Sequence, residues 1–582
     1  MTAQTANSKA APWLLILLIL SLPSTFASKP MKPAADTIYL NGNIYLGQSV
    51  QNGNPTSPGP SARAEAIAVK GDRILAVGTN QDVRRYRDGK TKTVDLGEHF
   101  LMPAFNDAHV HLAAGGLEKL QVDLAGAKSL HEMQARIAAH MEGLSAGQWI
   151  LGRGWDHTLW PERRLPNRRD IDAVVQNHPA YLSRVDGHIA VVSSAALVAA
   201  GITAATPDPP GGKIDRDAQG EPTGILRETA DEMLRAKLPP PTSELRRRAI
   251  ELALAEAARC GIGSVQDNSD WEDFLVYEDL EREGKLSLRI TEWLPFDQAA
   301  ADLAAHRARH PQTDPRLHTG MLKAFLDGSL GSRTAALLAP YADDPGNLGL
   351  LRYDLHRLGE MIDERVESRF QVGFHAIGDR AVQMALDAFA EAERYARERA
   401  IMPPAGGDFR FRIEHAQVVT ADQFQRFREL RVIASMQPGH LLTDMNWAWE
   451  RLGPQRARYS YAWKSFLDHG VILAFGTDFP VEPISPFRGL YAAITRKNEA
   501  GTKEYFPEER IAIDQAITAY TAGSAYAELA DKEKGVLRPG MLADFVVLDR
   551  DLTKVTPREV LGARVLRTVV GGQTVYEADD HR

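Results

Sequence analysis

Eight short β-rich segments, most of them separated by helical segments, run through the middle of this 582-residue chain. Strands are expected at residues 101–111, 261–267, 286–294, 319–328, 370–378, 409–417, 431–440 and 470–480. Helical periodicity is clear at residues 242–260, where Thr242 is a candidate N-cap, and at 379–398. Eight repeats of strand and helix predict an α/β fold of the (β/α)8 TIM-barrel type.

The two ends of the chain have a different pattern from the middle. Residues 36–100 and 536–580 are rich in short alternating strands and in turn signals such as Asn-Gly. We expect them to form one small composite β domain, a β-sandwich built from both termini, beside a barrel that occupies residues 101–535. Residues 113–241 are too many for one crossover after the first barrel strand, so we interpret them as an insertion near the active-site mouth.

The N-terminus has the layout of a secretory signal peptide over residues 1–27. A basic residue, Lys9, precedes an apolar run at residues 13–22, and Pro23 and small residues before Ser28 complete the cleavage pattern. The run is shorter than the roughly 20 residues of a membrane span. We therefore expect an exported protein, periplasmic or secreted, with no stable membrane span after signal removal; an uncleaved membrane anchor is the alternative.

Composition excludes several classes of protein and of site. The net charge is −8, and acidic and basic residues are interspersed, so the positive patch of a nucleic-acid-binding protein is missing. The single cysteine, Cys260, rules out an intrachain disulfide and a multi-thiolate zinc site. A transition metal in this chain must therefore be held by histidines, carboxylates or less usual ligands.

Residues suited to metal binding recur where the predicted barrel strands end. His109 and His111 share one face of the first strand, because residues two apart point the same way. Each such residue alone has an ordinary structural explanation, such as a buried histidine or an Asx-turn aspartate. The whole set follows the strand order, which is hard to reach by chance. Its members are His109, His111, Lys323, His375, His415 and Asp478.

This order of residues resembles that of the amidohydrolase superfamily of metal-dependent hydrolases. Longer stretches, including MLKAFLDGSLGSRTAAL, GFHAIGDRAV, RIEHAQ and FGTDFPVEPISPFRGLYAAITR, are similar to the branch that contains N-substituted formamide deformylase. The resemblance runs from about Asp36 to Tyr576. It implies two divalent metal ions, for which we expect zinc, although such ligands also take manganese, iron or nickel.

The resemblance also implies how the ligands are shared. His109 and His111 would hold the more buried ion together with Asp478. His375 and His415 would hold the second ion.

A further implication concerns Lys323. Carboxylated by CO2, this lysine would bridge the two ions as a carbamate, which offers the oxygen ligands that an ammonium lacks. A lysine that is not carboxylated would instead imply a single metal ion.

The implied reaction uses a metal-activated water, whose pKa falls toward about 7. Asp478 would accept the water proton and pass it to the leaving nitrogen, first as a general base and then as a general acid.

Three further residues are candidates for substrate binding. His188 and Arg227 lie in the insertion, and His440 ends the seventh strand. Trp155 and Trp160 are candidate aromatic surface near the site. The alternatives are that the insertion residues pack the insertion onto the barrel and that His440 is an ordinary loop histidine.

The sequence therefore predicts an enzyme that hydrolyses a non-peptide C–N bond in a small-molecule amide. A deaminase or cyclic-amide hydrolase on the same site is one alternative, because fold and metal ligands do not set the substrate. A non-catalytic regulatory or binding protein on the same scaffold is another. The oligomeric state stays open, with a homo-oligomer among the possibilities.

Overall fold

The computed structural model describes residues 33–579, except residues 52–53, 56–61, 143, 145–146, 185–188, 210–211 and 405–406. The predicted signal peptide lies outside the described residues. Among the helices that the structure does describe, none has the length and apolar character needed to cross a membrane.

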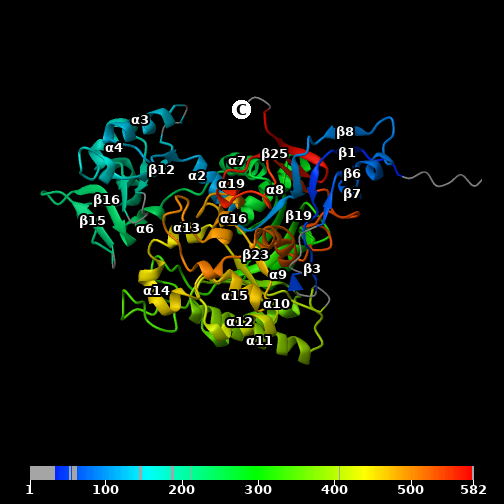
Figure 1. Ribbon diagram of the computed structural model, residues 1–582. Helices are drawn as coiled ribbons and strands as arrows, with labels where there is room; N and C mark the ends of the chain where they lie inside the picture. Colours follow the sequence, from blue (N-terminus) through cyan, green and yellow to red (C-terminus); the bar gives the residue numbers. More distant parts are fainter. Residues whose placement is uncertain are drawn as a thin grey trace, which may run out of the picture.

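The centre of the molecule is a barrel of eight parallel strands that neighbour one another in chain order (Figure 1). The last strand is linked back to the first by a parallel bridge between Val110 and Phe479. The predicted (β/α)8 fold is therefore confirmed. Its strands are β10 (Phe105–Val110), β17 (Ile262–Asp267), β18 (Arg289–Pro295), β19 (Leu317–Phe325), β20 (Val372–Ala376), β21 (Arg412–His415), β22 (Ile433–Met436) and β23 (Leu473–Phe475).

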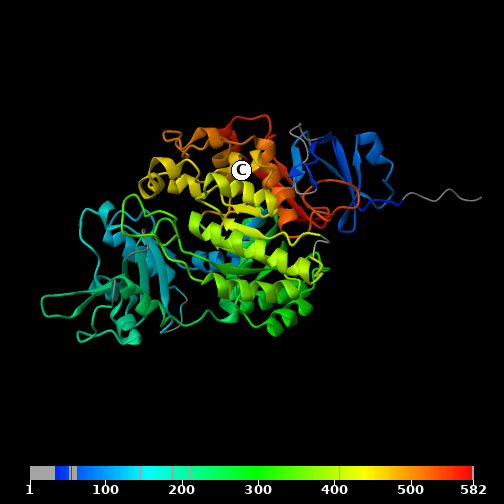
Figure 2. The ribbon, with the colours of Figure 1, turned by 90° about the horizontal axis from the view of Figure 1, so that it is seen from below.

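Helices cover the outside of the barrel (Figure 2). In the first helix after the insertion, α7 (Ser243–Arg259), the Thr242 hydroxyl accepts a hydrogen bond from the Leu245 backbone N–H, as expected of an N-cap. One face, including Ile250, Ala253, Leu254 and Ala257, is buried, which is the stripe of an amphipathic helix. The other outer helices include α8 (Trp271–Arg282), α9 (Ala300–Arg309), α10 (Leu355–Glu367), α11 (Asp379–Glu398), α12 (Ala421–Glu429) and α16 (Pro486–Thr495).

Strands from both ends of the chain form two sheets on one side of the barrel (Figure 1). The strand β24 pairs with β9 in antiparallel fashion, so the last strands of the chain continue a sheet begun before the barrel. The rings of Tyr39 and Phe545 lie 5.0 Å apart in an apolar core shared by the two sheets. One sheet contains β1 (Thr37–Leu40), β6 (Ala66–Lys70), β7 (Arg73–Gly78) and β8 (Lys92–Asp95); the other contains β2 (Asn43–Tyr45), β5 (Arg63–Ala64), β9 (Phe100–Pro103), β24 (Phe545–Leu548), β25 (Val565–Val570) and β26 (Gln573–Glu577).

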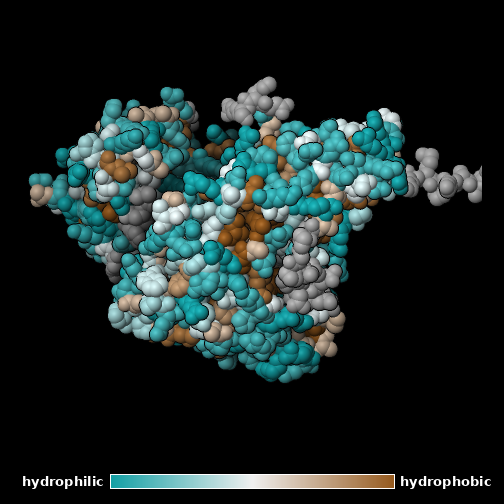
Figure 3. Space-filling view, viewed as in Figure 1, coloured by the Kyte–Doolittle hydropathy of each residue, from teal (hydrophilic) through white to brown (hydrophobic). Residues whose placement is uncertain are grey.

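The residues between the first and second barrel strands of the chain form a separate six-stranded sheet. It lies beside the barrel, on the side opposite the terminal sheets (Figures 1 and 2). Figure 3 shows a recess between this lobe and the rest of the molecule. Trp155 and Trp160 are buried in the lobe, and their indole N–H groups donate to the carbonyls of Leu182 and Ala127. They pack the insertion and provide no aromatic surface for a substrate. The strands are β11 (Val122–Asp123), β12 (Ile150–Trp155), β13 (Ala180–Arg184), β14 (Ile189–Val192), β15 (Gly212–Arg216) and β16 (Pro222–Glu228).

Candidate metal centre

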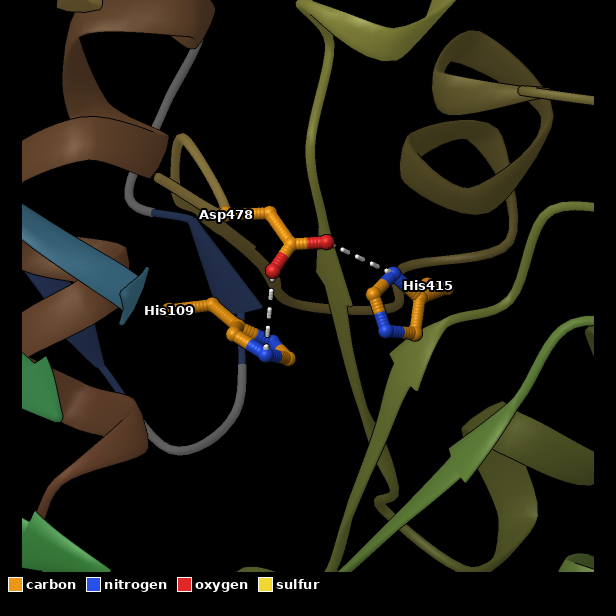
Figure 4. Close-up of side chains that lie close together, drawn as sticks. All are labelled: His109, His415 and Asp478. Carbon is orange, nitrogen blue, oxygen red and sulfur yellow. Dashed lines mark ion pairs between the residues drawn. The ribbon is translucent and has the colours of Figure 1, made fainter. Parts of the chain in front are cut away.

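The carboxylate of Asp478, just beyond β23, is the meeting point of three of the predicted ligands. Its Oδ1 lies 3.5 Å from Nε2 of His109 and 3.3 Å from Nε2 of His111. Its Oδ2 lies 3.9 Å from Nδ1 of His415 (Figure 4). Ligand atoms of His109, His415 and Asp478 all lie within 4.8 Å of one another, a spacing suited to a shared metal ion.

The histidines of the first strand are oriented by hydrogen bonds on their far sides. The Nδ1–H of His109 donates to Oε2 of Glu414 at 2.9 Å, and that of His111 donates to the Asn268 carbonyl at 2.8 Å. With the proton on Nδ1, each Nε2 presents a lone pair toward Asp478. This arrangement is typical of histidines that ligate metals.

His375 is positioned by the loop after β19. Its Nε2–H donates to the Gly328 carbonyl at 3.1 Å, and its ring centroid lies 4.5 Å from that of His415. Asp327 braces the loop by accepting hydrogen bonds from three backbone N–H groups, including that of Ile377. The Nδ1 of His375 is thereby left as the ring's acceptor atom.

Lys323 is buried against aromatic rings. Its Nζ lies 5.1 Å from the ring centroid of Trp293 and 4.7 Å from that of Phe325. Burial lowers the pKa of Lys323 to about 8. In the described part of the chain, neither Lys323 Nζ nor His415 Nδ1 has a hydrogen-bond partner, although both atoms are buried. Two buried polar atoms without hydrogen-bond partners, beside the Asp478 carboxylate, fit a site that a metal ion and its bridging ligand would complete.

Electrostatics favour the protonation states that metal ligands need. Burial lowers the pKa of His109 to about 4 and that of His375 to about 3. Burial alone would raise the pKa of Asp478, but its neighbours, including the hydrogen bond from His440, hold it well below its usual range. The imidazoles of His109 and His375 are therefore neutral and the Asp478 carboxylate is ionised at neutral pH.

Two of these residues have strained backbones. The φ angle is 74° at His415 and 59° at Asp478, in the left-handed region that residues with a side chain seldom adopt. Such conformations cost roughly 1–3 kcal/mol each and cluster at functional sites.

Comparison with known proteins agrees with this geometry. The model of the amidohydrolase family matches residues 92–576. This chain belongs to the amidohydrolase family.

Individual relatives cover nearly its whole length. The amidohydrolase is 34% identical to Protein LONG AFTER FAR-RED 3 of Arabidopsis thaliana, over 94% of this chain and 92% of that protein. It is 27% identical to N-substituted formamide deformylase of Arthrobacter pascens, over 88% of this chain and 95% of that protein. An uncharacterized metal-dependent hydrolase from Pyrococcus furiosus has a similar structure, with a TM-score of 0.74 and 32% identity over 89% of this chain and 100% of that one. The superfamily predicted from sequence is confirmed, and the predicted resemblance to N-substituted formamide deformylase is found.

A cavity of about 370 Å³ opens beside the centre of the amidohydrolase. His440 borders it, and its Nε2–H donates to Oδ2 of Asp478 at 3.1 Å. Burial would lower the pKa of His440, but the bond to Asp478 and nearby carboxylates raise it to about 9. The lining residues are His109, His111, Phe325, Ser329, Leu330, Gly331, His375, Ile377, His415, Gln417, His440, Asp444, Trp447, Asp478 and Val481.

Of the two insertion candidates, Arg227 is the one that lies among the described residues. The guanidinium of Arg227 binds the carboxylate of Asp215 in a bidentate pair, with the shortest contact 2.8 Å, and Arg227 is not among the lining residues. His188 lies outside the described residues.

Sequence reasoning missed the residues that support His109. Glu414 and Arg412 are fully buried, and Arg412 Nε donates to Glu414 Oε1 at 2.6 Å. The carboxylate of Glu414 contacts the His109 ring through its Oε2. The available signal was the spacing: residues 412 and 414 share one face of a strand.

Proposed function

We propose that this amidohydrolase hydrolyses a non-peptide carbon–nitrogen bond in a small-molecule amide. The observation that carries the proposal is the buried Asp478 carboxylate, which faces nitrogen atoms of His109, His111 and His415 at the edge of a cavity. A buried carboxylate that faces several imidazole nitrogens suits metal-assisted hydrolysis.

The donor set fits two divalent ions, with zinc the expected metal. His109, His111 and Asp478 would hold one of them, and His375 and His415 the other. When bound, such ions lower the pKa of a coordinated water toward about 7 and polarise the substrate carbonyl.

Lys323 completes the set in this proposal. Its neutral amine would add to CO2, forming an N–C bond and losing one proton, so that the product is a carbamate with two oxygen donors. The support is geometric: Lys323 Nζ is buried and lacks a hydrogen-bond partner within the described chain.

Asp478 is the proton carrier of the reaction. Its carboxylate would take the proton of the attacking water and deliver it to the amide nitrogen as the C–N bond breaks, so that the carbonyl carbon gains a hydroxyl and the amine leaves neutral. His440 holds Oδ2 of Asp478 through its 3.1 Å hydrogen bond. The cavity wall also contains apolar side chains, those of Phe325, Leu330 and Ile377.

The test combines metal analysis with a substrate screen. We expect about two equivalents of zinc per purified chain, turnover of at least one small amide, and loss of turnover by about 100-fold or more in Asp478→Asn. Asp343→Asn, which changes a carboxylate outside the cavity lining, is the control and should retain turnover. Full turnover by Asp478→Asn would refute the role given to Asp478. If the protein turned over only compounds with an amino substituent or only cyclic amides, a deaminase or a cyclic-amide hydrolase would be favoured.

We also propose that the protein is exported, on the strength of the N-terminal sequence alone. Cell fractionation with N-terminal sequencing of the mature chain tests this, and a start near Ser28 in a soluble fraction is expected.

A further inference from the structure

One carboxylate of the cavity, that of Asp444, takes no part in the candidate metal centre. It lies at the end of the short helix α13 (His440–Asp444), one turn after His440, and is 8% exposed. Residues four apart on a helix share a face, with Cβ atoms about 5–6 Å apart. Asp444 therefore borders the cavity one helical turn away from the histidine that contacts Asp478.

The positive charge that acts on Asp444 is that of His440, whose imidazole is hydrogen-bonded to Asp478. The Oδ2 of Asp444 accepts a hydrogen bond of 2.6 Å from the hydroxyl of Tyr461. Across the described ranges, no lysine, arginine or histidine nitrogen forms an ion pair with this carboxylate within 4.0 Å. Because the Asp444 carboxylate is buried and its cationic neighbour is bound to another carboxylate, a cationic group of a ligand in the cavity would stabilise it.

Three arginines close in sequence to lining residues are already engaged. Arg333 and Arg451 both bind the carboxylate of Asp343. Arg488 binds Glu482 at 2.8 Å. The residues that line the cavity include no lysine or arginine. His440, which lines the cavity and is protonated near neutral pH, already donates to Asp478, so it is not free to bind a substrate carboxylate.

Aromatic residues border the same space. Trp447 and Phe325 both line the cavity with Asp444. Aromatic faces attract organic cations, and a carboxylate beside them adds a charge-assisted hydrogen bond.

We propose that Asp444 binds a protonated amino group on the substrate, so that the preferred amides carry a cationic substituent two or three bonds from the scissile nitrogen. This inference rests on the proposed function, whose site it deepens. It disfavours N-acyl amino acids, whose carboxylate would face Asp444 across the cavity.

The test uses three amides that share one acyl group and differ only in the amine: 2-aminoethyl, propyl and 2-carboxyethyl. For the metal-loaded full chain we expect the 2-aminoethyl amide to exceed the propyl amide by about tenfold or more in kcat/KM, as a charge-assisted hydrogen bond predicts. The 2-carboxyethyl amide should be the poorest of the three. In Asp444→Asn the ratio of the first two should fall close to one.

Two further variants separate the charge from structural effects. Tyr461→Phe removes the hydroxyl that binds Asp444 but keeps the carboxylate, so the preference for the cationic amide should persist. Glu499→Gln neutralises an exposed carboxylate bound to Arg488 outside the cavity lining and should behave as the wild type. An Asp444→Asn variant that weakens all three amides equally, or a wild type that prefers the carboxyethyl amide, would overturn the inference.

Calorimetric binding of the same amides separates this inference from the proposed function. If no amide is hydrolysed but the 2-aminoethyl compound binds about tenfold more tightly than the propyl compound, and only when Asp444 is present, the hydrolytic proposal fails while the subsite stands. If amides are hydrolysed with no preference among the three, the subsite fails while the hydrolytic proposal stands.

Discussion

Glu414 holds His109 from the side opposite Asp478. Its Oε2 lies 2.9 Å from His109 Nδ1, while its Oε1 accepts a hydrogen bond from Arg412. All three side chains are buried. The carboxylate thus fixes both the orientation of the ring and the nitrogen that carries its proton.

Glu414→Gln is expected to weaken metal binding by about 10–100-fold, which is usual when the hydrogen-bond partner of a ligating histidine is changed. A chelator competition titration on the purified chain measures this without depending on a substrate. Ser435→Ala is the matched control, because it removes one donor to Glu414 but leaves the contact with His109. Equal metal retention in Glu414→Gln and the wild type would show that the contact does not position the ligand.

Lys323→Met is expected to reduce the bound metal from about two equivalents to about one, if a carbamate bridges the ions. The substitution preserves volume and burial and removes only the amine. Elemental analysis measures the stoichiometry, and mass spectrometry under gentle conditions tests for the added CO2 in the wild type. Two tightly held equivalents in Lys323→Met would contradict a bridging role.

Gly476→Ala is expected to distort the centre because the eighth strand approaches the first very closely there. A Cβ at position 476 would lie 2.5 Å from the backbone N of His109 and 3.0 Å from its Cβ. Backbone cannot move aside as a flexible side chain can, so we expect a cost of about 1–3 kcal/mol and a clear loss of metal affinity.

Gly439→Ala provides the comparison for Gly476→Ala. Gly439 has right-handed helical angles, and an added Cβ would meet only the Glu482 side chain, at 3.7 Å. Thermal unfolding and metal titration of the two variants should therefore separate clearly. Similar behaviour of both would mean that the strand contact near His109 relaxes freely.

The barrel and its ligand positions were readable from the sequence for a physical reason. Alternating strand and helix periodicity is local, and the ends of parallel barrel strands meet at one face, so His375 and His415 had to come close together. The contact of Glu414 with His109 was not readable, because it joins residues 305 positions apart and depends on how strands six and one are set within the closed barrel.

The insertion was harder to interpret. Trp155 and Arg227 occur in polar, motif-rich stretches that suggest a substrate surface. The structure instead buries Trp155 in the core of the lobe and pairs Arg227 with Asp215 across two neighbouring strands. A one-dimensional pattern does not distinguish a functional arginine from one that pairs locally.

The junction between the barrel and the terminal sheets provides a prediction that involves pH. Arg289 of β18 forms two hydrogen bonds, of 2.7 and 2.9 Å, with the carboxylate of Asp544, which immediately precedes β24. Burial alone would raise the pKa of Asp544, but Arg289 holds it below its usual value of 3.8. The pair therefore stabilises the fold above that value, and this stabilisation is lost as the pH falls through the lower folded-state pKa.

Asp544→Asn is expected to destabilise the protein by about 3–5 kcal/mol near pH 7, because it leaves Arg289 buried without its anion. The difference in unfolding midpoint from the wild type should be constant from pH 7 to about 5. It should shrink as the pH falls below about 4, where the Asp544 carboxylate is protonated first in the unfolded chain and then, at its lower pKa, in the folded protein. Thermal unfolding across this range measures it. Asp468→Asn, which breaks an exposed pair with Lys464, should change the midpoint little at any pH. A difference for Asp544→Asn that stayed constant down to pH 2 would mean that packing at the junction, and not the charge of Asp544, is what the substitution removes.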